Sequence, residues 1–168
     1  GSVESSEYKH LVLGLIFLKY VSDVFARRRA TLEAAVQDPD SEYFMPTEAA
    51  RQSILESRDE YLSEGVFWVP EGHRWNDLRA AAKQADIGTR IDAAMDAIEK
   101  ENDTLKGVLP KNYARRELTP ATLGGLIDTF SREDLTAEEH DGLDVLGRVF
   151  EYMVGQFASA EGKLGGEF

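Results

Sequence analysis

The N-terminal part of the chain contains a long stretch in which apolar residues fall on nearly every side of a helix. Leu, Val, Ile and Phe dominate from about Ser6 to Phe25, and charged residues then take over as far as Val36. A helix that is hydrophobic all round is typical of a buried position. The pattern therefore predicts one helix from Ser6 to Val36 whose first part is central and mostly buried. The turn residues Asp38-Pro39-Asp40-Ser41 end it.

Two shorter segments of different character follow. Thr47 is an N-cap candidate, and the mostly polar run from there to Tyr61 predicts a second helix that lies on the surface. Residues 66–70, Val-Phe-Trp-Val-Pro, are β-branched and aromatic and end in proline. This segment is either an isolated strand or an extended stretch that lays Phe67 and Trp68 over the core.

Helical spacing returns in the second half of the chain. A short helix is predicted from Trp75 to Gln84, and a longer one from Ile87 to Glu101. The apolar stripe of the longer helix consists of Ile91, Ala94, Met95 and Ile98. Residues 102–118 have the glycine, proline and charge content of a loop.

The last third of the chain contains two more predicted helices. Thr119 is an N-cap followed by Pro120 at the first helical position, which predicts a helix to about Phe130. The final helix is predicted from about Glu139 to Ala158, with an apolar stripe of Leu143, Leu146, Phe150, Met153 and Phe157. We therefore expect a mainly α protein, a single helical-bundle domain of about five to six helices with a short extended segment near residues 66–69.

Composition and charge narrow the possible functions. The 168 residues are 42% hydrophobic and 30% charged, a soluble globular profile, and the absence of cysteine excludes disulfides and thiolate chemistry. The longest apolar run, Leu11 to Leu18, is too short to cross a bilayer, and no signal peptide is recognisable, so we expect no membrane partner. The formal net charge of −12 disfavours independent binding of nucleic acid, because phosphate affinity comes largely from Lys and Arg. Any DNA contact therefore requires local basic patches.

The sequence contains no recognisable motif for catalysis, cofactor binding or metal binding. His10, His73 and His140 lie far apart, without metal-ligand spacing. A glycine-rich phosphate loop, a serine elbow and a zinc-protease helix are all absent. The final Gly-Gly-Glu-Phe resembles the diguanylate cyclase signature, but that motif needs a hairpin within a βαβ domain. We therefore expect no catalytic, cofactor-binding or metal-binding residue.

Two basic clusters are the candidate contacts with DNA or with another subunit. The first contains Arg27 and Arg28, next to Arg29 near the end of the first predicted helix, where cations also stabilise the negative end of the helix dipole. The second cluster lies in the predicted loop and consists of Lys106, Lys111, Arg115 and Arg116. Exposed cations in a loop are suited to contact phosphates. These residues either belong to an ordinary solvated surface or contact DNA or another subunit, and the sequence does not distinguish the two.

Several blocks of the chain occur in an order and spacing that indicate a family. Ser6–His10 leads into Leu13–Asp23, and Asp144–Tyr152 leads into Gln156–Lys163 and the final Gly165–Phe168. Further blocks are Val66–Pro70, Arg74–Trp75, Ile87–Gly88, Ile91–Glu99, Leu105–Ala114 and Leu123–Asp128. Together they resemble the N-terminal helical domain of the modification (M) subunits of type I restriction–modification systems. The resemblance extends over residues 6–168.

This resemblance implies a domain of a larger enzyme. Residues 1–160 would form the N-terminal helical domain, and residues 161–168 the linker into a catalytic domain. Gly1-Ser2 by itself is typical of the remnant of a removed tag. Such enzymes transfer a methyl group from S-adenosylmethionine to adenine N6 after extruding the base from the duplex. The family's catalytic Asn/Asp-Pro-Pro-Tyr/Phe motif is absent, because no proline follows Asn76, Asn102 or Asn112. We therefore expect this fragment to bind no cofactor and to be inactive alone.

The resemblance also implies partners and a role. In the assembled enzyme, two modification subunits flank one specificity subunit, restriction motor subunits join them, and the complex closes around double-stranded DNA in the prokaryotic cytoplasm. The N-terminal domain is expected to be a DNA-clamping and subunit-contact module. The alternative is a purely structural interaction domain that packs on the catalytic domain or the specificity subunit without touching DNA. A free-standing helical adaptor is a third interpretation, but it leaves the match at residues 144–168 unexplained.

Overall fold

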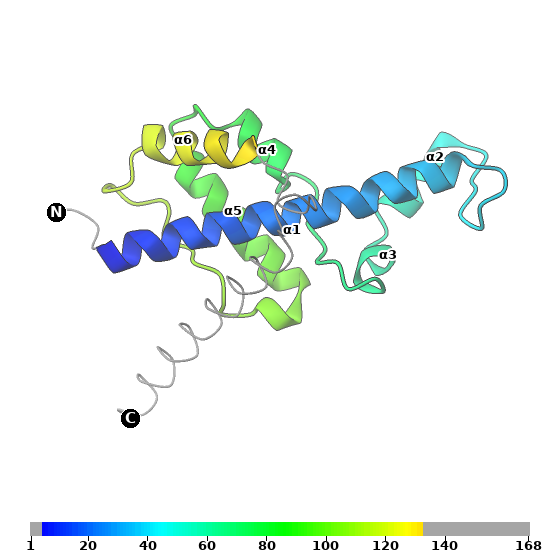
Figure 1. Cartoon of the computed structure of the whole chain (residues 1–168), viewed down its shortest axis with the longest axis horizontal. Helices are drawn as coiled ribbons and strands as arrows, with labels where there is room; N and C mark the ends of the chain where they lie inside the picture. The colour runs from blue at the N-terminus through cyan, green and yellow to red at the C-terminus, as the bar shows by residue number, and fades with distance from the viewer. Residues whose placement is uncertain (1–4, 133–168) are drawn as a thin grey trace, which may run out of the picture.

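The computed structural model describes residues 5–132, and this part of the chain is helical, without a strand (Figure 1). Six α-helices and one 3-10 turn in the described range confirm the expected mainly α class. The predicted final helix and the predicted domain limit at residue 160 lie outside the described residues. In chain order the elements are α1 (Ser5–Gln37), α2 (Glu48–Leu55), α3 (Asp59–Leu62), α4 (Trp75–Ala80), α5 (Ile87–Glu101), η1 (Asp103–Leu105) and α6 (Pro120–Ser131).

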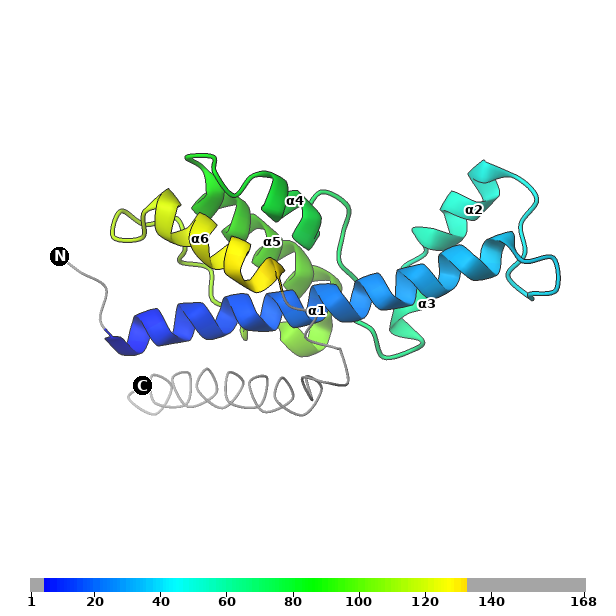
Figure 2. The ribbon, with the colours of Figure 1, turned by 45° about the horizontal axis from the view of Figure 1, so that its top comes forward.

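α1 is the axis on which the other helices pack. Its 33 residues make it about 50 Å long. Figures 1 and 2 show α4, α5 and α6 grouped against its N-terminal two-thirds, while α2 and α3 lie beside its C-terminal third. The core side of α1 buries a row of apolar residues, among them Leu11, Leu15, Leu18, Phe25 and Leu32. The predicted central helix is therefore confirmed.

The predicted second helix is interrupted, because its last residues turn into the core. Thr47 caps α2 as expected, and its Oγ1 accepts a hydrogen bond from the Ala50 N–H at 3.2 Å. The helix then stops at Leu55. Tyr61 is completely buried and stacks on Phe25, with ring centroids 4.7 Å apart. The prediction of one continuous surface helix is wrong here, since packing of Tyr61 on α1 outweighs the local helical preference.

Residues 66–70 are extended but form no strand in the described structure. Trp68 is buried, and the half-buried Phe67 ring meets Phe17 edge-on at 6.4 Å. Asn102 pairs with both backbone groups of Trp68: its Oδ1 accepts from the N–H at 3.0 Å, and its Nδ2 donates to the carbonyl at 2.9 Å. One side-chain amide thus satisfies the groups that a neighbouring strand would otherwise satisfy. Of the two interpretations of this segment, the extended one is confirmed.

The remaining helices follow the predicted pattern, with one exception. The bounds of α5 agree with the prediction, and Thr119 caps α6 by accepting from the Thr122 N–H at 3.1 Å. α4 ends at Ala80 rather than at Gln84. A Cβ at Gly124 of α6 would lie 2.2 Å from the Ala82 carbonyl oxygen. The predicted end of α4 is wrong because the chain turns there and α6 packs directly on its backbone.

Candidate DNA and subunit interface

The first predicted basic cluster lies within α1 rather than near its end. α1 continues to Gln37, so the last turn carries no cation, and the interpretation of these arginines as partners of the helix dipole is wrong. Arg28 joins α1 to α3: its Nε donates to the Glu60 carbonyl at 2.9 Å, and its guanidinium lies 3.6 Å from the Glu60 carboxylate. Arg27 is exposed. Arg28 therefore has a structural role within the domain.

Arg29 belongs to a network that the sequence did not indicate. Glu56, just after α2, accepts a hydrogen bond from Arg29 at 2.5 Å and two from Arg74 at 2.8 and 3.1 Å. The Arg74 guanidinium also lies over the rings of Phe25, at 4.8 Å, and Trp68, at 5.4 Å. Partial burial acts to raise the pKa of Glu56, but the bonds from Arg74 and Arg29 outweigh it and hold that pKa below its usual value.

The loop that carries the second basic cluster is fixed by acidic side chains of α5. Asp92 accepts hydrogen bonds from the backbone N–H groups of Tyr113 and Ala114, at 2.9 and 3.0 Å. Glu99 is buried and accepts from the Leu109 N–H at 2.9 Å. The loop is therefore anchored to α5 at Leu109 and at Tyr113–Ala114, and this fixes the positions of its cations.

Two of the four loop cations lie on the α5 side of the loop. Lys111 Nζ lies 2.6 Å from Glu99 and 3.2 Å from Asp96. The hydrogen bond to Glu99 is the main reason that the pKa of Lys111 is raised. Lys106 is largely exposed and lies 3.7 Å from Asp103, which is also largely exposed, so this pair contributes little to stability.

The other two, Arg115 and Arg116, line a separate hollow of about 260 Å³ beside the N-termini of α5 and α6. Arg115 pairs with Glu7 of α1, and its Nε lies 3.5 Å from Glu117. Arg116 is exposed, and its side chain makes no ion pair or hydrogen bond within residues 5–132. The four predicted residues thus do not form one patch, and Arg116 is the most available of them for an external phosphate.

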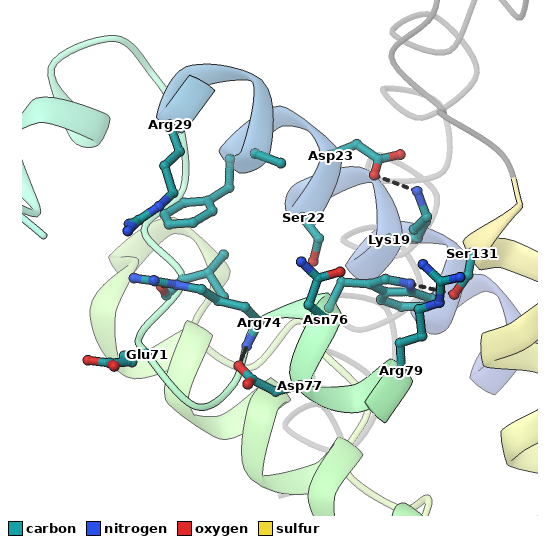
Figure 3. Close-up of a pocket in the computed structure, with 14 residues that line it drawn as sticks. Lys19, Ser22, Asp23, Arg29, Glu71, Arg74, Asn76, Asp77, Arg79 and Ser131 are labelled. Carbon is teal, nitrogen blue, oxygen red and sulfur yellow. Dashed lines mark hydrogen bonds and ion pairs between the residues drawn. The ribbon is translucent and has the colours of Figure 1, made fainter. Parts of the chain in front are cut away.

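A larger cleft of about 440 Å³ lies between α1 and α4 (Figure 3). Figure 3 shows Ser22 directed from α1 toward Asn76, and Arg79 beside Ser131 at the end of α6. The Ser22 hydroxyl is buried and has no hydrogen-bond partner in the described structure. Trp75 Nε1 donates to Ser131 Oγ at 2.8 Å and closes one end. No sequence signal distinguished this cleft, and its residues do not form a nucleophile–base pair.

The part of the chain that the structure describes contains neither a candidate metal site nor a candidate membrane span. Burial lowers the pKa of His10, and neither His10 nor His73 belongs to a group of three His, Cys, Asp or Glu side chains suited to a metal among the described residues. His140 lies outside the described residues. In residues 5–132, no helix has the length and apolar character needed to span a membrane.

Comparison with known proteins identifies the family. The model of the HsdM N-terminal domain matches residues 1–130. The chain belongs to the HsdM N-terminal domain family. It is 41% identical over 167 residues to the type I restriction enzyme MjaIX methylase subunit of Methanocaldococcus jannaschii, covering 99% of this chain and 30% of that protein. It is 36% identical over 121 residues to the HindI methylase subunit of Haemophilus influenzae, covering 60% of this chain and 27% of that protein. The chain thus spans less than a third of either relative, and the resemblance found in the sequence is confirmed.

The blocks that carried the resemblance meet at one place in this HsdM N-terminal domain. A Cβ on Gly14 of α1 would lie 2.4 Å from the Tyr113 hydroxyl, and one on Gly88 of α5 would lie 2.6 Å from the Tyr113 carbonyl oxygen. The Tyr113 hydroxyl donates to the Leu11 carbonyl at 2.6 Å, and burial raises the pKa of Tyr113 well above its usual value. Both glycines therefore allow two helices to close on the Tyr113 loop. Sequence reasoning missed this role, although a glycine inside a helical pattern often indicates close packing.

Proposed function

We propose that this chain is the DNA-clamping and subunit-contact domain of a type I DNA methylase subunit that methylates adenine N6 with S-adenosylmethionine. The observation that carries the proposal is the match to two type I methylase subunits in a region that makes up less than a third of each. We assign the methyl transfer and the binding of S-adenosylmethionine to the part of the enzyme that this chain does not span. The partners follow from the same assignment: a specificity subunit, a second methylase subunit, a restriction motor subunit and double-stranded DNA.

We assign the DNA contact of this domain to the hollow beside the N-termini of α5 and α6. Lys111 and Arg115 are engaged by carboxylates of the same chain, whereas Arg116 is exposed. The partial positive charge of helix N-termini adds to that of Arg116 and favours a phosphate there. Because the whole chain is strongly acidic, this contact positions DNA, and most of the affinity comes from the other subunits.

The experiment compares two charge reversals in the full methylase–specificity complex. Arg116→Glu should weaken DNA binding severalfold and reduce the slope of log affinity against log salt by about one, as expected for one lost phosphate contact. Arg58→Glu is the matched control, because Arg58 is also exposed but lies beside α3, where it pairs with Glu101. Equal effects of the two variants on affinity and salt slope would contradict the proposed site.

A second candidate function is a purely structural contact domain that never touches DNA. It is favoured by the internal ion pairs of Arg28, Lys111 and Arg115. This candidate predicts that Arg116→Glu leaves DNA affinity unchanged and that any loss appears in the assembly of the complex. Sedimentation of the complex without DNA separates the two functions.

A further inference from the structure

Three polar side chains that line the cleft between α1 and α4 have no partner within residues 5–132. The Ser22 hydroxyl is directed into the cleft, although Ser22 is only 7% exposed (Figure 3). The other two are Asn76 and Arg79, whose side chains make no hydrogen bond or ion pair within the described residues. A spacing of three residues places both on one face of α4. Because buried polar groups in proteins nearly always have a partner, the Ser22 hydroxyl indicates an occupant of the cleft.

The other cations of the cleft are engaged within the domain. Arg29 and Arg74 share the carboxylate of Glu56. Lys19 pairs with the acidic residue one turn further along α1. Arg79 is exposed and keeps a positive charge that no described side chain balances. An occupant of the cleft therefore meets one available cation together with an uncharged hydroxyl and an uncharged amide.

We propose that this cleft receives the carboxylate of an aspartate or glutamate side chain from another subunit of the assembled methylase. The proposal rests on the proposed function, in which this domain contacts other subunits. Ser22, Asn76 and Arg79 can all donate hydrogen bonds, whereas an ionised carboxylate only accepts them. Figure 3 shows Glu71, an exposed carboxylate that also lines the cleft, well apart from these three side chains. It therefore does not serve as their partner.

Charge and shape favour a protein carboxylate over a phosphate. One arginine balances the single negative charge of a carboxylate, whereas a phosphate monoester carries about −1.5 to −2 at neutral pH. Because the Ser22 hydroxyl is buried, its partner must enter the cleft, which the phosphates on the outside of a DNA duplex do not do. The cleft of about 440 Å³ lies within the range of roughly 300–1,000 Å³ for small-ligand sites, so it has room for an acidic side chain on a loop.

The substitution Ser22→Ala separates this role from a role in folding. In the 168-residue chain it should leave the urea unfolding midpoint unchanged or raise it, because it removes a buried hydroxyl without a partner. In the full methylase–specificity complex without DNA, it should weaken assembly about tenfold, because a hydrogen bond to a charged group is lost. The control is Ser53→Ala, an exposed position of α2 whose hydroxyl bonds to the Ala49 carbonyl of its own helix, and it should leave assembly unchanged.

Two results of this comparison would overturn the proposal. The first is a clearly lower unfolding midpoint of Ser22→Ala, since the hydroxyl would then have a partner within the chain. The second is assembly of Ser22→Ala with the affinity of the parent complex. Because assembly is measured without DNA, either result leaves the proposed DNA contact of Arg116 intact, and a failed Arg116 experiment leaves this one intact.

Carbodiimide coupling identifies the carboxylate itself. Arg79→Lys keeps the positive charge and places an amine at the cleft, and a carbodiimide joins an amine directly to a carboxylate that it contacts. In the assembled complex, mass spectrometry should find the new lysine coupled to an aspartate or glutamate of another subunit. The matched control is Arg58→Lys, because Arg58 lies 3.3 Å from Glu101 of its own chain and its replacement should couple there. Coupling at position 79 only to a carboxylate of the same chain, or no coupling there when the control reacts, would overturn the proposal.

Discussion

Gly124 and Gly125 are neighbours in α6, but their surroundings differ. A Cβ at Gly124 would lie 2.2 Å from the Ala82 carbonyl oxygen, a contact with backbone that has little room to move. A Cβ at Gly125 would meet nothing within 4 Å. Gly124 is therefore required for close packing of α6. Gly125 has no such role, and its backbone freedom only lowers the stability of the helix.

These surroundings predict opposite effects of the same substitution. Gly124→Ala should lower the free energy of unfolding by about 1–3 kcal/mol through overpacking, and Gly125→Ala should raise it by up to about 1 kcal/mol because alanine favours the helix. Urea unfolding followed by circular dichroism measures both values, and each variant is the control for the other. Equal shifts of the two midpoints would contradict the close approach of α6 to Ala82.

At the level of elements, Glu56 is the residue that holds three segments together. Its carboxylate joins Arg29 of α1 and Arg74 before α4 to the end of α2. In Glu56→Gln the two guanidinium groups lose the carboxylate that they share, although Arg29 keeps its ion pair with Glu33 at 3.3 Å. The free energy of unfolding should fall by about 1–2 kcal/mol at neutral pH, the lower part of the range for bonds to charged groups because the site is partly exposed and screened.

The same variant should change the dependence of stability on pH. The pKa of Glu56 is lower in the folded chain than its ordinary value. Its ionised form therefore adds stability above the ordinary glutamate pKa, and this contribution is lost as pH falls through the lowered value. The difference in unfolding midpoint between the parent chain and Glu56→Gln should thus shrink toward zero in acid. A difference that stays constant from neutral to acid pH would contradict this role.

The sequence predicted elements better than it predicted contacts. The stripe of α5 and the Thr119-Pro120 start of α6 are local signals, and both helices formed where they were expected. The break after Leu55 depends on Tyr61 reaching Phe25, a contact between distant segments that periodicity does not encode. The sequence also did not predict which cations are free to contact DNA, for the same reason. Arg115, for example, pairs with Glu7, which is 108 positions away in the chain. Which cation stays exposed therefore depends on tertiary contacts between segments that are far apart in the chain.

At the scale of the whole molecule, the domain is a long helix that organises two groups of partners. α4, α5 and α6 lie at one end with the Tyr113 loop, and α2 and α3 lie at the other (Figure 2). Arg116 belongs to the first group and Arg58 to the second, so these two exposed arginines test different ends of an acidic domain. We expect DNA to meet the first end when the methylase is assembled.

Hydrogen exchange on the full methylase–specificity complex, with and without DNA, measures this contact. DNA should slow exchange of the amides around Arg116, in residues 114–119, and leave α2 and α3 unchanged. The subunits without DNA provide the baseline, so protection from assembly alone is subtracted. Exchange in residues 114–119 that is the same with and without DNA, in a complex saturated with its duplex, would contradict the claim.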